Sequence, residues 1–251
     1  MVDFEKVEDN ELACEDEQRL EALIALVELD EDLLLAARLS FEYYEDLPYH
    51  NLNHALTVAE NSLEMAQDEK LTKNEKKILL LAALWHDASY GVPLQEAEVS
   101  KEHRSARLAY DAITMTANEG ELMLTSIFAQ EVQTTILATN VDSEINTKLA
   151  RILNTADLAN LYSDDKMIML KETGALFIEK LYLERRSALA ENVTTLEESM
   201  DGLEDWIFGQ KEFVERLIQR KLDPDGLPAL KALTNLKFIS RENLLQFFSK
   251  K

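Results

Sequence analysis

The segment 78–85, with the sequence ILLLAALW, constrains the fold of this chain more than any other. Thr72 stands shortly before it and is of a residue type that often caps the N-terminus of a helix. A helix that is apolar on every side must be surrounded by other elements of the protein. We therefore expect a helix that begins after Thr72 and is buried throughout the run 78–85.

Helical periodicity extends over nearly all of the chain. Near the N-terminus, apolar residues recur at helical spacing on one face, at Leu20, Leu23, Ile24 and Val27. The 251 residues include only six Gly and four Pro, too few turn-forming residues for the many turns of a β-sandwich or barrel. No strand-like alternation persists along the sequence. We predict an all-α protein, with further helices at about 50–67, 96–116, 124–138, 143–161 and 166–192.

The charge of the chain limits its partners. The formal net charge is −22, and the basic residues are thinly scattered. A protein that binds long nucleic acid needs a basic face to replace counterions, so we expect no such partner. No apolar run approaches the ~20 residues that span a bilayer, and the N-terminus is acidic where a signal peptide is basic. We expect a cytoplasmic protein without membrane contact, and the sequence leaves its oligomeric state open.

A histidine and an aspartate stand side by side at His86-Asp87, where the apolar run ends. Gly91 and Pro93 follow and break the helix. Burying an ionised carboxylate costs several kcal/mol unless it is paired or bound to a metal. Imidazole and carboxylate together suit a divalent first-row metal. Core packing does not explain this pair, which is the strongest sign of a functional site in the sequence.

Asp157 is a second carboxylate in apolar surroundings, with Leu153, Leu158 and Leu161 around it on a predicted helix. The same desolvation cost requires a cation there. His50 and His54 add two imidazoles four residues apart after Pro48, a spacing that places both on one helix face. Helical bundles often build metal sites from facing helices. We expect three helices to converge there, carrying His54, His86 with Asp87, and Asp157.

The order His54, His86-Asp87, Asp157 resembles the HD superfamily of metal-dependent phosphohydrolases. Flanking segments resemble a bacterial HD-phosphohydrolase subgroup over about residues 47–162, namely PYHNLNHA, LLLAALWHDASYG, KEHRSARLA, ILATN and LNTADLANL. FVERLIQRK and ISRENL near the C-terminus resemble it more loosely. The resemblance implies an HD-domain helical bundle in which His54, His86, Asp87 and Asp157 bind metal. It divides the chain into an acidic arm with a first helix (1–45), an HD-type metal-binding core (46–165) and C-terminal helices packed on it (166–251).

The form YHNxxHA at Tyr49–Ala55 also resembles the opening of cyclic-nucleotide phosphodiesterase catalytic domains. This resemblance implies that His50 protonates the leaving oxygen while His54 binds metal. Tyr49 and Asn51 are candidates for substrate contact. Packing explains Tyr49 equally well, and a helix-capping role explains Asn51 equally well. Asp87 is a candidate catalytic residue that bridges a second, more weakly held ion.

The chain departs from the subgroup at two places. It reads Thr139-Asn140 where the subgroup has a histidine after ILAT, and Glu102-His103 where the subgroup has two glutamates. Glu102 is a candidate general base, with two alternatives: it orients a ligand histidine, or it is merely solvated. The periodicity of its helix permits His103 to supply an imidazole in place of the missing one.

These residues together predict a metal-dependent phosphohydrolase that cleaves a phosphoester or phosphoanhydride of a nucleotide or similar small phosphorylated metabolite. The cofactor is one or two divalent ions, with Mn, Fe, Zn, Co, Ni and Mg all suited to two His and two Asp. A cyclic-nucleotide phosphodiesterase is the alternative within enzymes. A metal-containing sensor or interaction protein without turnover is the alternative outside them, favoured by the missing histidine and the acidic N-terminus.

Overall fold

The computed structural model describes residues 4–96, 98–115, 122–140, 143, 146–159, 163 and 165–188, with short pieces between 205 and 246. Among these residues there is no strand, and the all-α prediction is confirmed. The helices are α1 (Phe4–Val27), α2 (Glu31–Leu39), the 3-10 helix η1 (Ser40–Tyr43), α3 (Leu52–Asp68), α4 (Lys73–Trp85), α5 (Lys101–Met115), α6 (Leu122–Leu137), α7 (Lys148–Asp157) and α8 (Lys166–Ala188).

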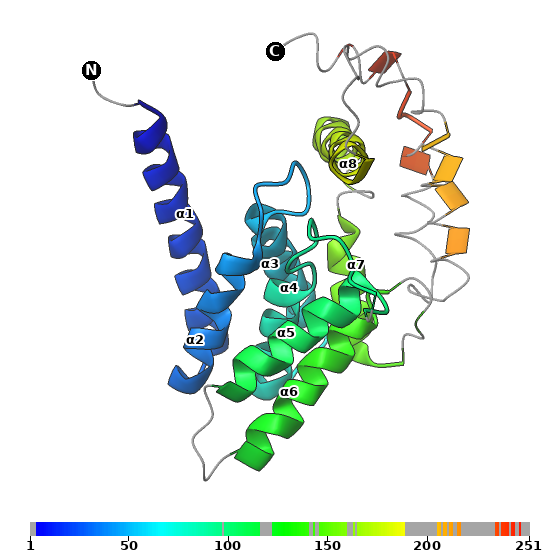
Figure 1. Ribbon diagram of the computed structural model, residues 1–251. Helices are drawn as coiled ribbons and strands as arrows, with labels where there is room; N and C mark the ends of the chain where they lie inside the picture. Colours follow the sequence, from blue (N-terminus) through cyan, green and yellow to red (C-terminus); the bar gives the residue numbers. More distant parts are fainter. Residues whose placement is uncertain are drawn as a thin grey trace.

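Helix α4 is the centre of the fold, as its apolar run predicts. Every residue from Ile78 to Trp85 is at most 1% exposed. The helix packs against α1, α2, α3, α5, α6 and α7 (Figure 1). Its start is fixed by a capping box, in which Thr72 accepts from the backbone N–H of Glu75 and the Glu75 carboxylate accepts from that of Thr72. The C-terminal end of this buried helix delivers His86 and Asp87.

Helix α3 joins the N-terminal helices to α7. Its buried face repeats at helical spacing and includes His54. The Arg19 guanidinium of α1 donates to the carboxylate of Glu60, with Nε 2.8 Å from Oε1, and to Oδ1 of Asn53 at 2.7 Å. On its other side α3 packs against α7, whose first turn is capped by the Thr147 hydroxyl. The C-terminal end of α7 carries Asp157 towards α3.

Three helices begin later than their periodicity predicts. The helix expected from residue 50 begins at Leu52, so His50 lies in the bend before it and the two histidines do not share a helix face. The helix expected from residue 96 begins at Lys101, because the preceding residues form a loop. The helix expected from 143 begins at Lys148. In each case the apolar pattern identified the helix but not its first turn.

Helix α8 lies beyond the end of the bundle formed by α3, α4 and α7 in Figure 1. Its start agrees with the expected 166, and the expected continuation from 189 to 192 lies outside the described residues. Most of the predicted C-terminal region 166–251 beyond α8 also lies outside them. One side chain of α8, Glu179, reaches the segment before α3 and is 1% exposed.

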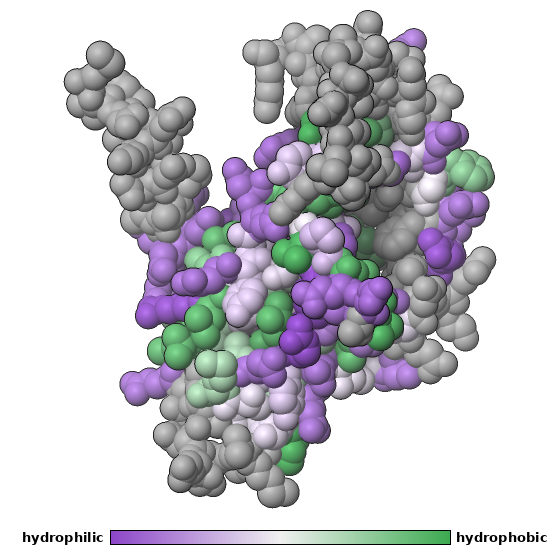
Figure 2. Space-filling model, viewed as in Figure 1, coloured by the Kyte–Doolittle hydropathy of each residue, from purple (hydrophilic) through white to green (hydrophobic). Residues whose placement is uncertain are grey.

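The described helices include none that is both long enough and apolar enough to cross a membrane. On the face shown in Figure 2, apolar patches among the described residues are small and alternate with hydrophilic ones. A mixture of this kind is ordinary for a protein surface.

Candidate metal centre

Four side chains meet where α3, α4 and α7 come together. They are His54, His86, Asp87 and Asp157, and one ligand atom from each lies within 4.8 Å of all the others. His54 comes from the first turns of α3, His86 and Asp87 follow directly on α4, and Asp157 ends α7. The convergence of three helices that the sequence predicts is therefore present in the structure.

His86 has its ring oriented by the helix that carries it. Its Nδ1 lies 2.8 Å from the carbonyl oxygen of Ala83, and because a carbonyl only accepts, Nδ1 donates this hydrogen bond. Its Nε2 is buried and points into the cluster, where no described residue meets it with good hydrogen-bond geometry, although the Asp87 carboxylate lies close. A backbone carbonyl that holds one ring nitrogen while the other faces a cluster of donors is the usual arrangement of a metal-binding histidine.

The carboxylates lie close to both imidazoles. Asp87 Oδ2 is 2.9 Å from His86 Nε2 and 3.6 Å from His54 Nε2. Asp157 Oδ1 is 3.1 Å from His54 Nε2 and 3.5 Å from His86 Nε2. The imidazole side chains are 4% and 1% exposed, whereas those of Asp87 and Asp157 are 14% and 27% exposed. The histidines thus form the floor of the site, and the carboxylates face its opening.

The electrostatics of the cluster favour positive charge. Burial alone would raise the pKa of Asp87 and Asp157, but the imidazoles around them outweigh it, so both pKa values lie below the usual range. Burial alone would lower the pKa of His86 and His54, and the two carboxylates reverse this, so both pKa values are raised. Two ionised carboxylates at this depth require a cation.

A divalent metal ion fits these residues. Two imidazole nitrogens and two carboxylate oxygens are a donor set suited to Mn²⁺, Fe²⁺, Co²⁺, Ni²⁺ or Zn²⁺. The orphaned Nε2 of His86 gains a partner when a cation is present, and the ion supplies the positive charge that the carboxylates need. Asp87 and Asp157 are the more exposed members of the cluster, so water or substrate would reach a bound ion from their side.

His50 lies beside this cluster, in the bend before α3. Its Nε2 is 3.8 Å from Asp87 Oδ2, and its ring centroid is 5.7 Å from that of His54. One face of the ring stacks on Tyr90, with 3.6 Å between centroids and 16° between planes. The imidazole is therefore next to the candidate ligands without belonging to the group of four.

Glu179 of α8 fixes the position of His50. Its Oε1 accepts a hydrogen bond from His50 Nδ1, and its Oε2 accepts from the backbone N–H groups of Tyr49 and His50 at 2.9 and 2.8 Å. Burial alone would raise the pKa of Glu179, but these bonds from His50 and Tyr49 outweigh it and lower the pKa. This residue was not predicted, although the apolar segment around it, LFIEKL, carries the same signal that identified Asp157.

The two candidates for substrate contact serve the protein itself. The Asn51 side chain caps α3, accepting from the backbone N–H of His54 at 3.0 Å and donating to the carbonyl of Leu47 at 2.7 Å. The Tyr49 ring packs against His54, with 4.5 Å between centroids. Their packing and capping roles are thus observed, and their contact with substrate stays a prediction.

Glu102 and His103 lie on the first turn of α5, outside the group of four. Glu102 Oε2 accepts from Nδ2 of Asn140 at 3.1 Å, so it contacts the segment in which the subgroup has its additional histidine. Its role as general base stays a prediction. His103 is exposed and its Nδ1 lies 3.0 Å from the Ser100 hydroxyl, so it does not supply an imidazole to the four-residue cluster.

Arg104 holds the loop that follows Asp87. This 6% exposed guanidinium donates to the backbone carbonyls of Ser89, Val92 and Pro93, at 3.2, 2.7 and 2.8 Å. It also forms a bidentate pair with Glu98, with Nε 2.9 Å from Oε1. An arginine buried with this many acceptors ties both ends of the loop to α5.

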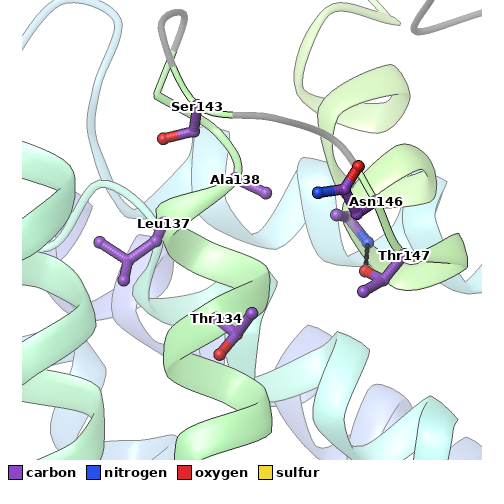
Figure 3. Close-up of a pocket in the computed structure, with 7 residues that line it drawn as sticks. Thr134, Leu137, Ala138, Ser143, Asn146 and Thr147 are labelled. Atoms are coloured by element: carbon purple, nitrogen blue, oxygen red, sulfur yellow. Dashed lines mark hydrogen bonds between the residues drawn. The ribbon is translucent and has the colours of Figure 1, made fainter.

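A separate hollow of about 170 Å³ lies between α6 and the start of α7 (Figure 3). It is at the opposite end of α7 from Asp157, and its lining has no acidic, basic or thiol group. The lining residues are Thr134, Leu137, Ala138, Ser143, Asn146, Thr147 and Ala150. Its side chains offer no catalytic chemistry, so the candidate site remains the His–Asp cluster.

Comparisons with known proteins agree with this geometry. The phosphodiesterase domain of a RhoPDE fusion protein from the choanoflagellate Salpingoeca rosetta is 19% identical, with a TM-score of 0.59, covering 96% of this chain and 91% of that chain. A second structure of the phosphodiesterase domain of this organism's rhodopsin phosphodiesterase is 18% identical, with a TM-score of 0.56 and coverages of 96% and 88%. At this identity the likeness concerns the fold. No curated protein matches the sequence.

The family model of the HD domain matches residues 51–159. This range contains all four residues of the cluster and ends just beyond Asp157. Residues 51–159 therefore have the sequence character of an HD domain, in agreement with the resemblance of this segment to the HD superfamily.

Proposed function

We propose that this protein hydrolyses a phosphoester or phosphoanhydride bond in a nucleotide or similar small phosphorylated metabolite. The observation that supports this most directly is the cluster of two imidazoles and two carboxylates with a further imidazole, His50, beside it. Such a cluster suits a cation, and a bound cation attracts an anionic phosphoryl group even in a protein with a net charge of −22.

His54, His86, Asp87 and Asp157 would hold one or two divalent ions. When bound, such an ion polarises a phosphoryl oxygen and lowers the pKa of a water molecule in its shell towards neutrality. The protein contributes the orientation: the Ala83 carbonyl fixes the ring of His86, and the Tyr49 ring packs against that of His54.

His50 donates a proton to the leaving oxygen. It stands next to the ligands but outside them, and its Nδ1 is engaged by Glu179, which leaves Nε2 to face the site near Asp87. A proton donor positioned this way typically contributes 10²–10⁴-fold to the rate. Glu179 is a positioning residue, because it holds both the ring and the backbone of His50 without facing the cluster.

The test combines metal analysis with a panel of substrates. Purified protein should contain a divalent ion and hydrolyse nucleoside phosphates or a generic phosphoester. The variant Asp87→Ala should lose both, whereas Asp111→Ala, an exposed aspartate of α5, should keep both. Full metal content and full activity in Asp87→Ala would refute the proposal.

The same panel decides between the proposal and its alternatives. Cyclic mono- and dinucleotides belong in it, because the YHNxxHA segment and the fold of the similar structures favour a phosphodiesterase as the second candidate. Cleavage of a cyclic nucleotide with little action on nucleoside phosphates would establish that candidate. Tight binding of a phosphorylated compound without any product would instead indicate a metal-containing sensor.

A further inference from the structure

Lys101, the first residue of α5, is the outer layer of a stack that begins at His50. Its Nζ lies 3.4 Å from the ring centroid of Tyr90. His50 is stacked on the same ring with 3.6 Å between centroids. Two groups this close to one centroid cannot share a face, so the ammonium and the imidazole cover opposite faces of Tyr90. The cation therefore stands one aromatic ring away from the proposed proton donor.

The ammonium of Lys101 has no anionic partner among the described residues. Its contact is the face of Tyr90 alone, whereas Lys73, Lys77 and Lys148 each pair with a carboxylate. Burial lowers the pKa of Lys101, against the opposing charges of carboxylates that lie further away. A half-buried cation with unused donors, at the edge of a site, is able to bind an anion.

The loop that connects Tyr90 to Lys101 is anchored by hydrogen bonds near its start. Tyr90 begins it and Lys101 ends it, and the Arg104 guanidinium binds its backbone through Ser89, Val92 and Pro93. Lys101 is thus positioned by the clamp of Arg104 and by Tyr90 rather than by an ion pair of its own. A cation placed in this way need not give up a carboxylate partner when an anion arrives.

We propose that Lys101 binds a second phosphate group of the substrate, carried on the leaving-group side of the scissile bond. This inference rests on the proposed function, since His50 marks the side on which the leaving oxygen lies. The Lys101 ammonium lies on the far side of His50 and Tyr90 from the cluster. A leaving group that carries a phosphate can therefore pair with this cation, whereas an uncharged leaving group gains nothing from it. The enzyme therefore favours phosphoanhydrides, such as nucleoside diphosphates, over nucleoside monophosphates.

The reaction with ADP as a probe is balanced without a further reactant. The water oxygen bonds to the terminal phosphorus, the bond from that phosphorus to the bridging oxygen breaks, and the bridging oxygen leaves with AMP and takes the proton from His50. The products are AMP and inorganic phosphate, and the proton of the attacking water returns to solvent or to His50. With AMP as a probe the leaving group is adenosine, which carries no charge for Lys101 to bind.

The experiment compares kcat/KM for ADP and AMP in the wild type and three variants. Lys101→Met should lower kcat/KM for ADP roughly tenfold or more, the effect of losing a hydrogen bond to a charged group, through a higher KM. Its kcat/KM for AMP should change less than about twofold. Lys101→Arg should keep most of the preference for ADP, and Lys73→Met, which removes an exposed lysine of α4, should match the wild type. Equal losses on both substrates, or no loss on either, would overturn the role of Lys101.

A binding measurement separates this inference from the proposed function. Calorimetric titration of the metal-loaded protein should show tighter binding of inorganic pyrophosphate than of inorganic phosphate, and Lys101→Met should remove most of that difference. Metal content and the melting temperature of each variant report whether the site is intact. If the wild type hydrolyses no phosphorylated compound, the proposed function fails, yet the pyrophosphate comparison still decides whether Lys101 binds a second phosphate. The same affinity for both anions in the wild type would refute it.

Discussion

The two sides of the candidate site are built in different ways. The metal side, His54, His86, Asp87 and Asp157, is carried on or directly after helices that pack in the core and lies wholly inside the HD domain. The side of the proposed proton donor, called the proton-donor side, is carried by irregular segments: His50 lies in the bend before α3 and Tyr90 in a loop. A carboxylate from α8, outside the matched range, binds the backbone of this bend through the N–H groups of Tyr49 and His50.

The two sides therefore differ in the contacts that hold their side chains in position. On the metal side, the ring of His86 is 1% exposed and donates to a backbone carbonyl of its own helix, so packing and local backbone contacts hold it in place. On the proton-donor side, orientation depends on the hydrogen bonds that Glu179 accepts from Tyr49 and His50. Changes on the metal side should therefore abolish function, and changes on the other side should reduce the rate while metal remains bound.

The largest expected effect is that of His86→Ala. Removing a buried ligand leaves Asp87 and Asp157 with less positive charge, so the protein should lose its metal and roughly 10³-fold or more of its activity. His103→Ala removes an exposed histidine of α5 and should leave metal content and activity unchanged. Metal analysis and initial rates provide both readouts. If His86→Ala kept the metal content and activity of His103→Ala, the metal side would not be essential for function.

A smaller effect is expected for Glu179→Gln. Loss of the carboxylate weakens the hold on His50, so kcat should fall roughly ten- to a hundredfold, within the range for a misplaced general acid. KM and metal content should stay as in the wild type, because Glu179 contacts none of the four cluster residues in the described hydrogen bonds. The control is Glu172→Gln on the same helix, because Glu172 pairs only with the neighbouring Lys171 among the described ion pairs. Loss of metal from Glu179→Gln would show that the two sides are not independent.

The sequence predicted that the four residues of the metal side come together, because buried carboxylates are conspicuous. Asp87 and Asp157 each stand in apolar surroundings, where a carboxylate is normally paired with a cation or bound to a metal. The buried helix α4 was predictable for a related reason, since an apolar run of this length has no place on a surface. Such features can be predicted from the sequence because the neighbours that bury these residues are on the same helices.

The proton-donor side was harder to predict because its contacts are long-range. The spacing of His50 and His54 suggested one helix face, but the Asn51 side chain caps the helix two residues later and leaves His50 outside. Glu179 stands 129 residues from His50, so its apolar surroundings indicate burial but nothing in the sequence connects it with that histidine. The loop before α5 was predicted at Gly91 and Pro93 but runs on to residue 100, and its contacts to Arg104 through backbone carbonyls leave no trace in the side-chain pattern.

The stability of the loop that joins Tyr90 to Lys101 should depend on pH. The Arg104 guanidinium, through its hydrogen bonds, lowers the pKa of Glu98 to about 2 from a usual 4.5. Because the folded-state pKa is lowered, this pair stabilises the protein fully above pH 4.5 and loses its contribution as the pH falls towards 2. Urea unfolding midpoints of the wild type and Glu98→Gln should differ at pH 7 and approach each other at pH 3. Glu96→Gln, an exposed glutamate of the same loop, controls for loss of charge. A constant difference from pH 7 to 3 would contradict this account.

The smallest effect on function is expected at the far end of the same helix that carries His86. Thr72→Ala removes the side chain that caps α4 and should cost about 1 kcal/mol of stability, or roughly 2–4 °C in melting temperature for a chain of this size. Helix α4 places this cap roughly 20 Å from His86, at 1.5 Å per residue, so metal content and kcat should stay within about twofold of the wild type. Thermal unfolding and initial rates measure the two quantities on one preparation. If Thr72→Ala reduced kcat as far as Glu179→Gln does, the rate would follow overall stability, and the proton-donor side would have no special dependence on its single carboxylate.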